Sequence, residues 1–216
     1  MGCSTRKCLR ILYRILAIFI CGYGISSHFQ WNNLDYNIHM FSFFTIQCNL
    51  LCFITLLLLF LQDFGYFPHQ NFTLLRGMTL SGILLTNLSY HFFMHPLKGE
   101  WGLHFLSDIS TKDLFVHYLV PLFMIFDWLL WQRKGSFQKE MIFLWLLFPF
   151  SYFTGTVARV AWLPDYHFSS SSGRFPYEFL NMDVLGVSTV LLYSAGIGIL
   201  FVILAYFVYR TDSLLS

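Results

Sequence analysis

Charged residues are scarce in this sequence. Asp, Glu, Lys and Arg make up 11% of its 216 residues, whereas a soluble domain carries about 25%. Hydrophobic residues make up 56%, and a soluble chain of this length could not bury so much apolar surface, because the buried fraction is limited by the ratio of surface to volume. The composition excludes a soluble globular domain and predicts an integral membrane protein.

The sequence also lacks features that mark several functional classes. Its formal net charge is only +2 and it has no basic stripe, so we expect no nucleic-acid partner. The five cysteines form no CxxC pair and none falls in an expected outer loop, so no disulfide framework is expected. The absence of an internal repeat counts against the usual transporter architecture. No motif indicates a cofactor.

Six apolar blocks predict the fold class, an all-α bundle of six transmembrane helices. Each block is close to the roughly 20 residues that cross about 30 Å of hydrocarbon. Helices are expected because every backbone polar group in lipid needs an internal partner. We therefore expect residues 1–216 to form a single integral membrane domain, whose helices cover approximately residues 11–27, 39–61, 74–94, 114–131, 141–162 and 185–209.

The placement of Lys and Arg predicts that both chain ends lie in the cytoplasm. With the N-terminus inside, the inner segments carry nine basic residues and the outer segments carry four, which agrees with the positive-inside rule. The inner set is Arg6, Lys7, Arg10, Arg14, Arg76, Arg133, Lys134, Lys139 and Arg210, and the outer set is Lys98, Lys112, Arg159 and Arg174.

A stripe of polar side chains follows the second block. Ser42, Thr45, Cys48, Asn49 and Cys52 recur at spacings of three and four residues, which places them on one face of a helix. Because this helix starts outside in the expected orientation, Thr45 lies just below the outer surface. Polar groups inside a membrane are costly, so their positions carry information about function.

The fourth block carries a histidine at a similar depth. His117 lies near the outer start of this helix, at about the level of Thr45. Asp113 precedes it by four residues on the same face, where its carboxylate could orient the imidazole.

Two further helices bring polar groups to this level. The third ends outside with Asn87, Tyr90 and His91, and the fifth ends outside with Thr156 and Arg159. Four helices therefore supply hydroxyl, amide, imidazole and guanidinium groups at one outer level. Reversing the orientation would keep these groups at one level but move them to the inner side.

Each of these residues also has a structural interpretation. A threonine such as Thr45 usually bonds to a carbonyl of its own helix. Asn49 and Asn87 are typical of groups that join neighbouring helices. His117 could be an interfacial histidine, and Arg159 could extend to the lipid headgroups.

Asp127 is an exception to the scarcity of buried charge. It lies deep in the fourth block, toward the inner side and off the His117 face. We expect it to pair with a base on that side, such as Arg76, or to accept hydrogen bonds from helix ends.

Three segments together resemble a known family. FFTIQCNLL at 43–51, FVHYLVPLFMIFDWLLW at 115–131 and FPYEFLNMDVLG at 175–186 are similar to stretches of the androgen-induced (FAR-like) family of six-pass membrane proteins. The likeness is closer still to that family's bacterial relatives. It covers nearly the whole chain in helix number and in the order of the segments. It implies a bacterial cell membrane. The expected orientation of the helices places the site toward the extracytoplasmic side.

The resemblance also implies a reaction. Characterised animal members of that family hydrolyse fatty acid esters of hydroxy fatty acids and depend on one Thr and one His inside the membrane. The matching motifs carry these functions onto Thr45 and His117. The implied partner is a lipid substrate within the bilayer, and no function is implied for residues 175–183.

Ester hydrolysis requires a nucleophile, a base and donors for the developing oxyanion. His117 would take the proton of the weakly nucleophilic Thr45 hydroxyl. Asn49 or Asn87 could donate to the oxyanion. His91 and Arg159 could contact the substrate, and an arginine suits a lipid carboxylate.

Two alternatives remain at the level of the sequence. The first is a metal-dependent hydrolase, because His91 and His95 have helical spacing and are followed by His104 and His117. No acidic third ligand accompanies them, so we expect no metal. The second alternative is a non-catalytic membrane protein that binds lipid or a partner.

Overall fold

The computed structural model describes residues 4–67, 71–94, 109–168 and 173–216. These residues form helices, and no strand occurs among them. Five stretches are long and apolar enough to cross a membrane: α1 (Thr5–Ser26), α3 (Phe44–Asp63), Thr111–Trp131, α8 (Met141–Trp162) and α10 (Val187–Leu214). The predicted all-α class is confirmed, and the apolar helices indicate an integral membrane protein.

The stretch Thr111–Trp131 changes its helical type along its length. It consists of α6 (Thr111–Leu114), the π-helical segment η4 (Phe115–Leu119) and α7 (Val120–Trp131). A π-helical turn holds more residues than an α-helical turn, and such turns occur frequently at functional sites.

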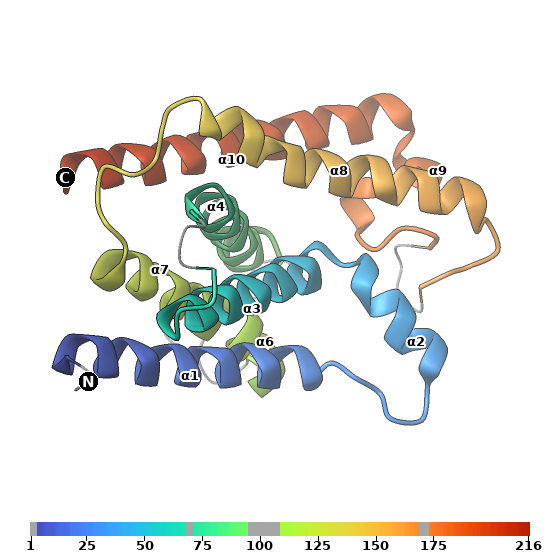
Figure 1. Cartoon of the computed structure of the whole chain (residues 1–216). Coiled ribbons are helices and arrows are strands. Elements are labelled where there is room, and N and C mark those ends of the chain that lie inside the picture. The colour runs from blue at the N-terminus through green and yellow to red at the C-terminus, as the bar shows by residue number, and fades with distance from the viewer. Residues whose placement is uncertain (1–3, 68–70, 95–108, 169–172) are drawn as a thin grey trace.

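Helix α4 (Thr73–Ser89) has 17 residues and continues as a second π-helical segment, η2 (Tyr90–Met94). It lies in the middle of the bundle, where it contacts α3, α7, α8 and α10 (Figure 1). A Cβ atom on Gly77 would lie only 1.9 Å from the Trp145 ring, so the missing side chain lets α4 approach α8 closely.

The second apolar block is divided in the structure. Residues 34–42 form α2 (Leu34–His39) and the short 3-10 helix η1 (Met40–Ser42). Phe43 has an extended backbone with φ −84° and ψ 130°, so α3 begins at Phe44 rather than at the expected residue 39. The Phe43 ring packs against those of Phe168 and Tyr177, at centroid distances of 5.4 and 5.6 Å. The break at Phe43 thus follows from tertiary packing, since the apolar block of the sequence continues across it.

The last block also differs from the expected 185–209. The 3-10 helix η5 (Glu178–Leu180) and α9 (Met182–Leu185) precede α10, and Gly186, with φ +76°, separates α9 from α10. Helix α10 continues to Leu214 because Asp212 is buried at its end: Trp128 Nε1 donates to Oδ1 at 3.1 Å and the Phe137 backbone N–H donates to Oδ2 at 3.0 Å. The fifth block agrees with the expected 141–162.

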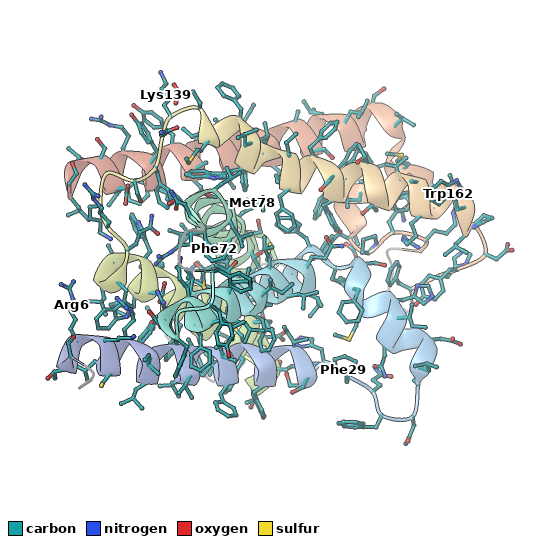
Figure 2. All side chains as sticks on the ribbon, in the orientation of Figure 1. Arg6, Phe29, Phe72, Met78, Lys139 and Trp162 are labelled. Atoms are coloured by element: carbon teal, nitrogen blue, oxygen red, sulfur yellow. The ribbon has the colours of Figure 1, made fainter. Side chains whose placement is uncertain are left out.

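Both chain ends lie at one end of the bundle (Figure 1). We call this end, which holds Thr5 and Leu214, the terminal end, and the opposite end, which holds α2 and α9, the distal end. Arg6 and Lys139 lie toward the terminal end, whereas Trp162 lies at the distal end (Figure 2).

A network of ion pairs joins four helices toward the terminal end. Arg14 of α1 donates from Nη1 to Asp63 Oδ2 at 2.7 Å and from Nε to Asp127 Oδ1 at 2.9 Å. Arg76 Nη2 donates to Asp127 Oδ2 at 2.6 Å, which confirms the expected pair. Arg10 Nη2 donates to Asp63 Oδ1 at 2.7 Å. Arg14, which the sequence indicated only as a cytoplasmic-side base, is buried in the centre of this network.

Candidate functional site

Asn49 joins two helices at the level predicted for the site. Its side chain is fully buried, and Nδ2 donates to the Thr45 carbonyl at 2.8 Å and to the Val116 carbonyl at 3.1 Å. It thereby fixes the Thr45 turn of α3 beside the η4 segment that contains His117. Because both N–H groups are used on carbonyls, this geometry favours a positioning function for Asn49 over that of an oxyanion donor.

Asn87 supports the same segment from α4. Pro121 lacks the N–H that would bond to the His117 carbonyl in a regular helix. Asn87 Nδ2 donates to that carbonyl instead, at 2.6 Å. The two asparagines therefore hold the π-helical segment from two sides.

His117 is buried between helices. Its ring stacks on the Tyr90 ring, with centroids 3.8 Å apart and an angle of 15° between the planes. Tyr90 begins the other π-helical segment, and His91 Nδ1 in that segment lies 3.1 Å from the Tyr118 hydroxyl oxygen. The two π-helical segments therefore contact each other at this level. Consecutive residues of one segment, Tyr90 and His91, contact consecutive residues of the other, His117 and Tyr118.

Asp113 lies at the edge of this cluster. Its carboxylate accepts a hydrogen bond from the Ser110 hydroxyl at 2.7 Å, interacts with the Tyr90 side chain, and lies 4.0 Å from His28 Nε2. Its expected influence on His117 would therefore act through Tyr90, whose ring covers the imidazole.

Thr45 has a partner that the sequence did not indicate. Its hydroxyl oxygen and its backbone nitrogen lie 3.5 and 3.4 Å from the Tyr177 hydroxyl oxygen. Burial raises the pKa of Tyr177, so its phenol stays protonated at neutral pH and keeps a hydrogen to donate. The Thr45 hydroxyl therefore faces Tyr177, whereas the His117 ring stacks on Tyr90. Only the family-like segment 175–186 contained a signal for Tyr177, and no function was assigned to it.

Arg159 and Thr156 lie on the distal part of α8. Arg159 Nη2 donates to the Arg174 carbonyl at 2.5 Å, and its guanidinium lies over the Phe168 ring at 5.0 Å. Thr156 is buried. Both residues line a cavity of about 260 Å³ between α8, η1 and the start of α3. This cavity also touches Ser42, three residues before Thr45.

The metal alternative rests partly on His95 and His104, which lie outside the described residues. In the described part of the chain, no group of three or more His, Cys, Asp or Glu side chains could hold a metal ion. His91 and His117 each have an aromatic neighbour, Tyr118 and Tyr90 respectively.

The chain was compared with protein-family models, curated proteins and solved structures, and none of them matches it. The resemblance of its three segments to the androgen-induced family therefore stays a prediction. The arguments for function rest on the geometry of the distal end.

Proposed function

We propose that the protein is a six-pass integral membrane hydrolase that cleaves a lipid ester at the distal end, with Thr45 as nucleophile and His117 as base. The expected substrate is a fatty acid ester of a hydroxy fatty acid. The observation that carries the proposal is the Asn49 side chain, which bonds to the Thr45 and Val116 carbonyls and so fixes the nucleophile beside the segment of the base. A buried, doubly bonded amide is a rigid support of the kind that active sites require.

The position of the chain ends supports six crossings. A chain whose two ends lie at the same end of a bundle crosses an even number of times, and Figure 1 places both ends together. The five long apolar stretches need one more crossing. The 17 residues of α4 and the five of η2 together reach the required length, since roughly 20 residues cross the hydrocarbon.

The distribution of charge supports a cytoplasmic terminal end. Arg6 and Lys139 lie toward that end (Figure 2), as the positive-inside rule requires of cytoplasmic segments. The distal site is then extracytoplasmic. A fusion reporter at Ser216 that is active only in the cytoplasm tests this orientation.

The proposed reaction proceeds through an acyl-threonine. The Thr45 hydroxyl oxygen bonds to the ester carbonyl carbon while His117 takes its proton. The alcohol oxygen of the substrate then leaves and receives that proton. Water attacks the acyl-threonine, His117 again transfers the proton, and a fatty acid and the free Thr45 hydroxyl result.

Tyr177 completes the proposed chemistry. In the tetrahedral intermediate, the oxyanion is attached to the same carbon as the Thr45 oxygen. The Tyr177 hydroxyl lies 3.5 Å from that oxygen and can donate to the oxyanion. His117 has to approach Thr45 when substrate binds, which is consistent with the long hydrogen bonds of unliganded active sites.

Purified protein in lipid vesicles provides the test. Thr45→Ala and His117→Ala should each lower the release of palmitate from palmitoyl-hydroxystearate by at least about a hundredfold, because a general base alone contributes 10²–10⁴-fold. Release is measured by mass spectrometry, and folding by size-exclusion chromatography in detergent.

Matched controls exist for both variants. Thr154 is an exposed threonine on α8 whose hydroxyl donates to the Phe150 carbonyl at 3.1 Å, and His167 is an exposed histidine in a loop. Thr154→Ala and His167→Ala should retain full turnover. Unchanged hydrolysis by the two site variants would reject the proposal.

The contact of the Thr45 hydroxyl with Tyr177 is compatible with a structural function of Thr45, and so favours a second candidate, a non-catalytic protein that binds lipid. In that case the wild-type protein would show no ester turnover. It would tolerate Thr45→Ala but lose lipid binding when Thr45 is replaced by a large residue such as Phe.

A further inference from the structure

The cavity beside α8 is polar and carries a positive charge. Its volume is about 260 Å³, and its walls include the side chains of Ser42, Gln47, Tyr152, Thr156 and Arg159. None of the residues that line it is acidic. A cavity of this kind is suited to an anion rather than to a cation or an apolar group.

Arg159 has no counterion in the part of the chain that the structure describes. Its two described contacts, the Arg174 carbonyl and the Phe168 ring, orient the guanidinium but leave its charge uncompensated. The nearest arginine in sequence, Arg174, is paired with Asp183 at 2.5 Å.

Two donors of Arg159 are enclosed. Nε and Nη1 are both buried and have no hydrogen-bond partner among the described residues. An enclosed donor without an acceptor costs about 1–3 kcal/mol, and more when it belongs to a charged group. The negative charge of a ligand in the cavity would compensate the unpaired charge of this guanidinium.

The cavity lies where the head of a lipid would lie. Arg159 is one turn before Trp162, which is 82% exposed at the distal end of α8 (Figure 2). An exposed tryptophan at a helix end is typical of the interface between membrane and water. Phe150, near the middle of α8, is also exposed and offers apolar surface to an acyl chain.

The cavity lies next to residues that flank Thr45. Tyr152 lines the cavity and donates to the Ser42 carbonyl at 3.1 Å, and its ring lies 5.0 Å from that of Phe44, next to Thr45. A group bound at Arg159 would therefore be held within the same part of the molecule as the Thr45 hydroxyl.

We propose that Arg159 and the hydroxyl groups around it form a binding site for the carboxylate of a fatty acid or of another acyl-chain amphiphile. A single guanidinium matches a singly charged oxyanion. The same chemistry could come from the phosphodiester of an acidic phospholipid. Binding at this site does not require turnover at Thr45. The binding proposal can therefore be tested independently of the proposed hydrolysis.

The test is a binding titration with parinaric acid, a fatty acid that becomes fluorescent in apolar surroundings, on full-length Thr45→Ala protein in neutral detergent. Parinaric acid should bind at least about tenfold more tightly than its methyl ester, which has the same chain without the charge. Arg159→Gln should weaken binding of the acid by about tenfold or more, as expected when a charged hydrogen bond worth 1.5–3 kcal/mol is lost, and should leave the ester unchanged.

Lys112→Gln is the matched control, because it removes one exposed positive charge from outside the cavity. It should leave both affinities unchanged. Equal affinities of acid and methyl ester for the unsubstituted Arg159 protein would overturn the proposal without reference to the folding of any variant. Equal weakening by Arg159→Gln and Lys112→Gln would also overturn it, since only general charge attraction would then be present.

Competition distinguishes the two sources of the anion. Displacement of parinaric acid by oleate but not by phosphatidylglycerol supports a free fatty acid as the ligand. Displacement by phosphatidylglycerol at similar concentration supports a phospholipid headgroup at the same guanidinium. Displacement by neither oleate nor phosphatidylglycerol would contradict an oxyanion site for lipids.

Discussion

The two ends of the bundle differ in how completely their polar side chains are paired. At the terminal end, Arg10, Arg14, Asp63, Arg76 and Asp127 each have a partner of opposite charge at 2.6–2.9 Å. At the distal end, short contacts such as that of Asn87 at 2.6 Å occur beside long or incomplete ones: the hydroxyls of Thr45 and Tyr177 are 3.5 Å apart, and Arg159 keeps two unpartnered donors. Removing one partner of a buried ion pair is strongly destabilising, because the other charge is left buried and unpaired. We therefore expect substitutions in the ion network to change stability most, and substitutions in the proposed site to change activity most.

The largest effect is expected from breaking the ion network. Asp127→Asn removes the carboxylate that accepts from both Arg14 and Arg76, and leaves two buried guanidinium groups without their shared partner. We expect destabilisation of about 3–5 kcal/mol, the usual cost of breaking a buried ion pair. Thermal unfolding in detergent measures this loss.

A surface charge near the same end provides the control. Lys139→Gln should not change the unfolding temperature, because Lys139 is exposed (Figure 2). The folded fraction of Asp127→Asn should retain its ester turnover per molecule. Loss of turnover with unchanged stability would reverse the assignment of the two ends.

The next largest effect is expected at Tyr177. Tyr177→Phe keeps the ring that packs on Phe43 but removes the hydroxyl beside Thr45. We expect turnover to fall by about a hundredfold, as when one oxyanion donor is removed. The unfolding temperature should change little, because the hydroxyl makes only long contacts. A full rate with Phe at this position would exclude Tyr177 as a donor.

A mixed effect is expected at Asn49, which is both buried and part of the site. Asn49→Leu keeps the side-chain volume but deprives the Thr45 and Val116 carbonyls of their shared donor. Stability should fall by about 1 kcal/mol, in the range of hydrogen bonds between membrane helices. Turnover should fall at least about tenfold if Thr45 and His117 have the proposed functions, because they would lose their relative positions. Equal turnover in the variant would show that Asn49 only stabilises packing.

The smallest effect is expected at the exposed pair in the loop. The Arg174 guanidinium holds the pKa of Asp183 below its ordinary value. Any stability from this pair is present above the ordinary carboxyl pKa and is lost as the pH falls through the lowered value. Because both side chains are solvent-accessible, Asp183→Asn should leave the unfolding temperature unchanged. A shift of several degrees would mean that charge contributes at the distal end as it does at the terminal end.

Much of the fold follows from the sequence, because lipid demands long apolar helices. The expected range 141–162 coincides with α8. The sequence places the start of α3 too early because Met40, Phe41 and Phe43 extend the apolar block before it, whereas the Phe43 backbone is extended and its ring packs on Phe168 and Tyr177. From the sequence, Arg14 indicated only the orientation of the chain in the membrane. A basic residue near a helix end has the same sequence pattern whether its side chain reaches water or pairs with a buried carboxylate.

The site could be predicted only in part. The depth argument places Thr45 and His117 on neighbouring helices at one level, and Asn49 connects those helices. Tyr177 is 132 residues from Thr45 along the chain, so no spacing rule could associate the two. The two hydrogen bonds from Asn49 to carbonyls could likewise not be predicted from the sequence. Helical periodicity indicates on which face a side chain lies, but not which group it contacts.

The π-helical segment at residues 115–119 sets the phase of an entire helix. In an α-helix each residue advances the side chain by about 100°, and the wider turn alters that advance between His117 and Asp127. The same helical stretch can therefore direct His117 toward Tyr90 and the Asp127 carboxylate toward Arg14 and Arg76. Removing one residue from this turn would misalign the two ends at once, so a one-residue deletion would be more harmful here than most substitutions.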